Sequence, residues 1–180
     1  MSKDIYKMTA TDITRSLFVK YVYNTQSLCV ANIYYWSDVF ESDFLAVSKA
    51  GYGTEFEIKI SKKDFLKDFE KKKTKSVFDK EQRMWINAET FKHDMLKEGR
   101  SKLKHFYFCV PEGLVSLGDI PDHAGLIEFK YPIHAHQSYL KMNIIKKAPE
   151  LPGSEKMDSR KELKIREAQK WQYYKQQIRK

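Results

Sequence analysis

Residues 54–60 constrain the fold more than any other segment, because their side chains alternate between polar and apolar in the order Thr-Glu-Phe-Glu-Ile-Lys-Ile. A two-residue period is typical of a β-strand that turns one face to the core and the other away from it. Residues 49–53, just before, contain two glycines and predict a tight turn. Residues 43–47, Asp-Phe-Leu-Ala-Val, supply the preceding strand. The sequence therefore predicts a β-hairpin over residues 43–60, and with it a protein that contains a sheet.

Helical and strand patterns follow one another along the rest of the chain. We expect helices at 10–22 and 158–179, a helix that starts after Ser61, and strands at 28–36, 105–110, 125–129 and 139–146. Ser61, with Asp64 three residues later, is a candidate helix cap. The basic run 71–75 is expected to be a solvated loop, and residues 76–103 an irregular stretch with one helix near 86–98. This order predicts an α/β domain whose mixed central sheet is flanked by helices.

The end of the chain differs from the rest, because prolines and a glycine at 149–153 precede a basic helical segment. We therefore expect a domain at 1–150 and a basic amphipathic helix within 151–180. Five side chains recur on one side of this helix: Ile165, Ala168, Trp171, Tyr174 and Ile178. We favour packing of this helix on the domain or on a second copy in a homodimer. The other interpretation is a nucleic-acid-binding arm.

The chain of 180 residues carries 33 Lys and Arg against 24 Asp and Glu, a formal net charge of +9. Such a charge favours a polyanionic partner, and nucleic acid is the first candidate. Cys29 and Cys109 lie inside apolar runs, which predicts buried thiols in a reducing compartment rather than a disulfide framework or a zinc cluster. No apolar run is long enough to span a membrane, and the N-terminus has no apolar stretch like that of a secretory signal. We expect a cytoplasmic protein.

Two acidic side chains are expected to meet across the predicted hairpin. Asp43 lies 14 residues before Glu57, and the midpoint between them is residue 50, inside the turn. Directly opposed side chains on antiparallel strands have Cβ atoms roughly 5 Å apart, so two carboxylates there repel unless a cation lies between them. Mg²⁺ prefers oxygen ligands and needs only one or two carboxylates. Lys59 shares the strand face of Glu57 and would lie beside the ion. The alternative is a surface hairpin with scattered charges.

Ser42-Asp43, a 13-residue spacer and then Glu57-Ile58-Lys59 resemble the motif of the PD-(D/E)XK nuclease superfamily. The expected order of helix, three strands, helix and strand is similar to its αβββαβ core, the restriction-endonuclease-like fold. Over roughly residues 10–150, the chain looks most like the MmcB-type DNA-repair branch and its phage-borne relatives. The segments that carry this likeness are 41–47, 55–65, 106–111 and 122–127.

The resemblance implies a Mg²⁺-dependent deoxyribonuclease of bacterial or phage DNA metabolism, in which Mn²⁺ would substitute for Mg²⁺. Asp43 and Glu57 would bind the metal, with the carbonyl group of Ile58 as a third ligand. Lys59 would orient the attacking water and stabilise the charge of the transition state. Endonuclease and exonuclease activity are both open. The competing hypothesis is a catalytically inactive module that keeps the nuclease fold and serves DNA binding or assembly.

The chain departs from the superfamily pattern in two places. Ser42 stands where a proline usually precedes the first aspartate, and the helix at 10–22 lacks the glutamate that many members use to organise the metal. Asp12 or Glu41 would then be the auxiliary acid, and the number of metal ions, one or two, stays open.

Other polar and aromatic residues allow a functional and a structural interpretation. Three lysines follow the predicted site on a helix and could contact phosphates or form a solvated face: Lys62, Lys63 and Lys67. We interpret three aromatic residues as core packing rather than base stacking: Tyr34, Tyr35 and Trp36. We interpret His134 and His136 as a surface pair rather than metal ligands, and His123 as part of a loop.

Overall fold

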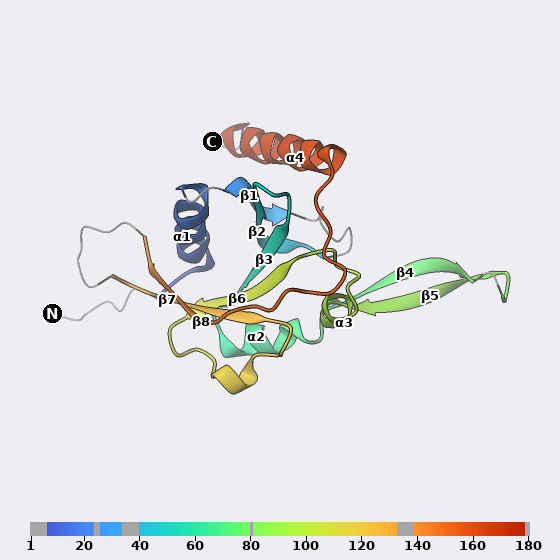
Figure 1. Ribbon diagram of the computed structural model, residues 1–180, viewed down its shortest axis with the longest axis horizontal. Helices are drawn as coiled ribbons and strands as arrows, with labels where there is room; N and C mark the ends of the chain where they lie inside the picture. The colour runs from blue at the N-terminus through green and yellow to red at the C-terminus, as the bar shows by residue number, and fades with distance from the viewer. Residues whose placement is uncertain (1–6, 24–25, 34–39, 80, 133–138, 179–180) are drawn as a thin grey trace.

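The structure is a computed structural model that describes residues 7–23, 26–33, 40–79, 81–132 and 139–178 (Figure 1). Its helices are α1 (Ala10–Tyr23), α2 (Lys62–Asp68), α3 (Lys92–Lys97) and α4 (Ser159–Ile178), with a short 3₁₀ helix, η1, at Leu117–Asp119. Its strands are β1 (Gln26–Ile33), β2 (Ser42–Ser48), β3 (Gly53–Ile58), β4 (Lys72–Asp79), β5 (Met84–Phe91), β6 (His105–Pro111), β7 (Gly125–Lys130) and β8 (Lys141–Lys146).

Six of the strands form one mixed sheet in the order β1-β2-β3-β6-β7-β8. β3 and β6 run parallel, as do β6 and β7, and the other neighbours are antiparallel. The expected order of helix, three strands, helix and strand is present as α1, β1 to β3, α2 and β6, with β4, β5 and α3 inserted before β6. The predicted α/β class, with a mixed central sheet and a C-terminal helix, is confirmed.

The predicted hairpin of β2 and β3 closes around residue 50. Phe44 pairs with Phe56, which is the register expected for a symmetric turn at that position. Gly51 has φ 89°, in the left-handed region that glycine enters without steric cost, and its N–H donates to the carbonyl oxygen of Ser48 at 2.8 Å. A local turn therefore sets the register of the two strands.

Helices cover both faces of the sheet, so its central strands are buried on both sides. Along β2, Phe44 belongs to the core under α1 and Leu45 to the core on the opposite face, as the two-residue period of a strand requires. α1 contributes Ile13 and Leu17 to the first core. Phe65 of α2 lies in the second core, together with side chains from α3 and α4.

The C-terminal helix α4 packs beside β1, at the edge of the sheet (Figure 1). Ile165 is fully buried in the same core as Leu28 of β1, and the side-chain amide of Gln169 donates to the carbonyl oxygen of Cys29 at 2.7 Å. The helix thus packs on the domain through its first half. Trp171, further along the expected apolar stripe, is exposed.

Two expectations for residues 71–103 are wrong. Where a loop and an irregular stretch were expected, β4 and β5 form a separate antiparallel hairpin, and the helix expected near 86–98 is confined to α3. The reason is that β5 is exposed or only partly buried along its whole length. A strand without a buried face needs no apolar row, so its two-residue period is absent from the sequence.

Cys29 and Cys109 are both buried free thiols, as expected. Burial raises the pKa of Cys29 to about 11 and that of Cys109 well above its ordinary value. In the part of the chain that the structure describes, no helix is both long and apolar enough to cross a membrane. The interpretations of five residues fall outside the described ranges: Tyr34, Tyr35, Trp36, His134 and His136.

Candidate functional site

Asp43 and Glu57 face each other where the β2–β3 hairpin opens. The paired register of β2 and β3 ends at Phe44 with Phe56, and the two acids lie one residue beyond this pair, Asp43 on β2 and Glu57 on β3. One carboxylate oxygen of Asp43 accepts a hydrogen bond of 2.8 Å from the N–H of Ile58. The structure therefore brings together the two acids that the sequence predicted to meet.

The Glu57 carboxylate is fully buried and contacts three ammonium groups. Lys59 Nζ, from the segment that follows β3, lies 2.7 Å from Glu57 Oε1. Lys71 contacts the same oxygen, and Lys92 contacts Oε2. Lys59 was expected here. Lys71 and Lys92 were missed, because both belong to polar segments that sequence patterns assign to solvent.

Asp68, on α2, is a second buried acid that the sequence analysis missed. Lys59 Nζ and Lys71 Nζ lie 2.9 and 2.7 Å from Oδ1 of Asp68, and His93 Nε2 lies 3.0 Å from its Oδ2. One signal could have revealed it. Asp68 follows the buried Phe65 by three residues, and residues three apart share a helix face.

Glu55, two residues before Glu57 on β3, is a third buried acid. Ser42 Oγ donates to Glu55 Oε2 at 2.9 Å, and Lys92 Nζ lies 2.7 Å from Glu55 Oε1. At Glu55 Oε1 and at Asp68 Oδ1, the ammonium groups lie at ion-pair distance without hydrogen-bond geometry, so these contacts are ion pairs. Ser42 thus orients one of the buried acids.

Lysines and acids balance in this buried cluster, except at Asp43. Three carboxylates are matched by three ammonium groups: Glu55, Glu57 and Asp68 by Lys59, Lys71 and Lys92. Buried charges are tolerated when they are paired in this way. Within the described ranges, no ammonium group lies at ion-pair distance from Asp43, whose carboxylate is held by a backbone N–H instead. Asp43 is therefore the acid left over for a further cation.

The two opposed acids have pKa values that shift in opposite directions. Burial raises the pKa of Asp43 to about 6, and the charge of Glu57 acts in the same direction. Burial also acts to raise the pKa of Glu57, but the ammonium groups of Lys92 and Lys59 outweigh it and hold this pKa below its ordinary value. Burial disfavours the charge of Lys59, yet Glu57 and Asp68 raise its pKa above the ordinary value. Such divergent carboxyl groups are typical of functional sites.

His93 connects Asp68 to His123, and His123 lines a cavity. His93 Nδ1 and His123 Nε2 are 2.9 Å apart. Because the Asp68 carboxylate accepts from His93 Nε2, a neutral His93 must accept at Nδ1 from His123. Burial, with His93 and Lys97 acting in the same direction, lowers the pKa of His123 to about 4. His123 was expected only to shape a loop.

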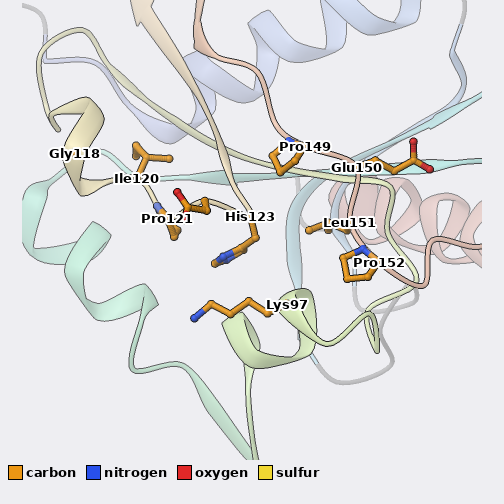
Figure 2. Close-up of a pocket in the computed structure, with 10 residues that line it drawn as sticks. Lys97, Gly118, Ile120, Pro121, His123, Pro149, Glu150, Leu151 and Pro152 are labelled. Carbon is orange, nitrogen blue, oxygen red and sulfur yellow. The ribbon is translucent and has the colours of Figure 1, made fainter.

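The cavity lined by His123 has a volume of about 680 Å³. Figure 2 shows the His123 ring and the Lys97 side chain one above the other on one side of it, with Leu151 and Pro152 on the other side. The remaining lining comes from two chain segments: Gly118, Ile120, Pro121 and Asp122, and Pro149 and Glu150.

A smaller cavity, of about 230 Å³, opens beside Asp43. Its other lining residues are Phe40, Glu41, Lys71, Lys72 and Lys73. Glu41, one of the two expected auxiliary acids, therefore shares a cavity with Asp43. The other, Asp12, accepts hydrogen bonds from the N–H and the hydroxyl of Thr9 at 2.9 and 2.7 Å, and these bonds lower its pKa. Asp12 thus completes a capping box with Thr9 at the start of α1, and these hydrogen bonds are not directed to the acid cluster.

The expected phosphate contacts on α2 are exposed lysines: Lys62, Lys63 and Lys67. Lys62 Nζ lies 2.5 Å from the Asp119 carboxylate. The buried side of the same helix carries Asp68. Ser61, as predicted, caps this helix by accepting from the Asp64 N–H at 3.2 Å.

The residues present fit a Mg²⁺ ion that keeps most of its waters. Asp43 and Glu57 offer carboxylate oxygens from opposed strands, and the cavity beside Asp43 leaves space for water. A cation at Glu57 would replace the ammonium group of Lys71, whose side chain is 37% exposed, whereas those of Lys59 and Lys92 are each 4% exposed. In the described ranges, no three His, Cys, Asp or Glu side chains form a group suited to a metal, so the fit rests on two acids and water.

Fold and site together define a mixed α/β protein with a buried cluster of acids and lysines at the open end of its central hairpin. No protein-family model matches the chain, and no curated protein matches it either. Among solved structures, it is similar to the SPO1766 protein of unknown function from Silicibacter pomeroyi, with 14% sequence identity and a TM-score of 0.57. The similarity covers 97% of this chain and 94% of that chain, and it shows a shared fold alone.

Proposed function

We propose that the protein is a metal-dependent nuclease that hydrolyses DNA phosphodiester bonds at Asp43, Glu57 and Lys59, in bacterial or phage DNA metabolism. The observation that supports this most is the state of Asp43. Its carboxyl group is partly buried, has a raised pKa, lies opposite a second acid and borders a cavity. A carboxyl group whose burial opposes folding is expected where a site is built for a ligand rather than for stability.

Each of these residues has a distinct role in the proposal. Asp43 and Glu57 would hold Mg²⁺ or Mn²⁺, with the carbonyl group of Ile58 as a third ligand. When bound, such an ion acts as a Lewis acid at the phosphodiester. Lys59 keeps its proton, because Glu57 and Asp68 raise its pKa, so it orients water and stabilises negative charge rather than acting as a general base.

Lys71 distinguishes the proposal from its alternative. Its ammonium group contacts Glu57, and its side chain also lines the cavity beside Asp43. In a nuclease, Lys71 would leave Glu57 for this cavity and meet the negative charge of the phosphate there. In a catalytically inactive DNA-binding or assembly module, Lys71 would stay on Glu57. That second candidate is favoured by one observation, which is that both Glu57 oxygens already contact ammonium groups.

Incubation of supercoiled, linear duplex and single-stranded DNA with the protein and Mg²⁺ or Mn²⁺ tests the proposal. Asp43→Asn is the most informative variant, because it removes a charge that opposes folding and keeps an acceptor for the Ile58 N–H. Glu57→Ala would instead remove one of the two acids that pair with the buried ammonium group of Lys92, so lost activity there could reflect unfolding. Asp64→Asn, at an exposed position of α2, is the matched control.

We expect the wild-type protein and the Asp64→Asn control to cut DNA at similar rates. Asp43→Asn should lose activity by about 100-fold or more, as expected for a group that binds a catalytic ion, while remaining folded. The enzyme proposal fails if wild-type protein cuts none of the DNA forms with either metal, or if Asp43→Asn cuts as fast as wild type.

A further inference from the structure

The β4–β5 hairpin forms an arm that extends from the candidate site. Its eight residue pairs run from Lys72 with Phe91 to Asp79 with Met84, a length of about 27 Å at roughly 3.4 Å per residue. Figure 1 shows this arm reaching away from the body of the protein. An isolated two-stranded hairpin is marginally stable in water, so the arm depends for its stability on contacts at its base.

Both ends of the arm are attached to Glu57. Lys71 directly precedes β4 and Lys92 directly follows β5, and the ammonium groups of both contact the Glu57 carboxylate. The backbone closes the same junction, because the Lys92 N–H donates to the carbonyl oxygen of Lys71 at 3.0 Å. A partner bound along the arm would therefore lie beside the acid cluster.

Apolar side chains gather toward the far end of the arm. Phe78 and Trp85 are paired across the two strands, with their rings edge to face and their centroids 5.6 Å apart. These side chains are 45% and 68% exposed. Met84 and Ile86, on the other face of β5, are exposed as well. Both faces of this end of the arm are therefore apolar and open to a partner.

Positive charge accompanies these apolar side chains. Residues 71–91 contain six Lys and Arg against three Asp and Glu. Lys72 and Lys73 are exposed at the root of the arm, where they line the cavity beside Asp43, and Arg83 is exposed near the turn at its far end. A negatively charged partner with apolar faces complements this distribution.

We propose that the arm lies in a groove of duplex DNA, with its basic root on phosphates near the candidate site and Phe78 and Trp85 against base pairs. A two-stranded ribbon fits a DNA groove. Apolar side chains inserted between base steps, with cations on adjoining phosphates, occur together in proteins that bend DNA. Single-strand binding instead uses a stacking platform in a basic groove, which a ribbon exposed on both faces does not provide.

This inference rests on the proposed function and names duplex DNA as its substrate. Its test is the affinity of the full chain for a short fluorescent duplex, measured by anisotropy in EDTA so that no cleavage occurs. Trp85→Ala should weaken duplex binding about tenfold, whereas Val22→Ala, at an exposed apolar position on α1, should leave it unchanged. Arg83→Gln should reduce the slope of log affinity against log salt by about 1, and Arg15→Gln on α1 should not.

A variant with a shortened arm is the control for local unfolding in the point variants. Replacing residues 77–86 with Asn-Gly closes the hairpin directly after the pair of Ser76 and Asn87 with a two-residue turn. This variant should show unchanged thermal unfolding and at least the loss of affinity seen for Trp85→Ala. Wild-type affinity of the shortened protein for duplex DNA would overturn the proposal. So would dependence on the arm for single-stranded DNA alone, or loss of self-association without loss of DNA binding, which would identify a protein contact.

These experiments test the DNA-binding role of the arm and the nuclease activity separately. If binding in EDTA depends on the arm but the wild-type protein never cuts in Mg²⁺ or Mn²⁺, the nuclease proposal fails and the arm stands. If the shortened protein binds and cuts duplex DNA like wild type, the arm fails and the nuclease stands.

Discussion

Replacing Asp43 with Asn should stabilise the protein at neutral and alkaline pH. Burial, followed by the charge of Glu57, raises the pKa of Asp43 from its ordinary value of 3.8 to about 6. In the unfolded chain the same carboxyl group ionises near 3.8, so ionisation above that pH favours the unfolded state. Asn carries no charge and keeps an oxygen that can accept from the Ile58 N–H.

The size of the effect follows from the linkage between proton binding and folding. Because the pKa is raised in the folded state, the stability due to the proton on Asp43 is fully present below pH 3.8 and is lost as the pH rises through 6. A pKa shift of about two units lowers the free energy of unfolding by about 3 kcal/mol at pH 8 and by about 1 kcal/mol at pH 4.5. Because Asp43 is partly exposed, these values are upper limits. At pH 8 the variant should unfold up to about 6–12 °C higher than wild type.

Urea and thermal unfolding of wild type and Asp43→Asn between pH 4.5 and 8 measure this difference. Asp64→Asn is the control, and its stability should follow that of wild type across the range. At pH 8, Mg²⁺ should stabilise the wild-type protein and leave Asp43→Asn unchanged, since the ion offsets a charge that the variant lacks. A variant no more stable than wild type at pH 8, or equally more stable at every pH, would refute the claim that the Asp43 charge opposes folding.

Three further predictions concern the buried cluster and the thiols. Lys71→Met should bind Mn²⁺ about tenfold more tightly than the control Lys67→Met, because it removes the ammonium group that competes with the metal ion for Glu57. Calorimetry measures both affinities, and equal values would mean that Lys71 does not compete with the metal ion. Asp68→Asn should lower the free energy of unfolding by about 3–5 kcal/mol in urea, because the buried ammonium group of Lys59 loses a partner. Asp64→Asn should lower it by less than about 1 kcal/mol, and a similarly small loss for Asp68→Asn would contradict the ion-pair cluster. Both cysteines should resist an aromatic disulfide reagent at pH 7.5 until the protein unfolds, because burial raises their pKa values, and rapid colour release from folded protein would contradict this.

The central hairpin could be predicted from the sequence because its causes are local. The two-residue period of 54–60 and a turn that contains Gly51 specify a strand pair, its faces and its register. That register ends with Phe44 and Phe56, so it leaves Asp43 and Glu57 just beyond the same pair. The β4–β5 arm could not be found in this way, because a hairpin without a buried face leaves no periodic pattern of apolar residues.

The sequence by itself determined that Asp43 and Glu57 meet across a hairpin and that Lys59 follows on the same strand face, because neighbouring residues on paired strands have few ways to be arranged. Only the tertiary structure decided that Lys71 and Lys92 contact Glu57. Lys92 lies 35 residues after Glu57 in the sequence. A lysine in a polar segment carries no local sign of burial. Its charge becomes buried only when helices and sheet close around it, and the distant acids that make burial tolerable are chosen by that packing.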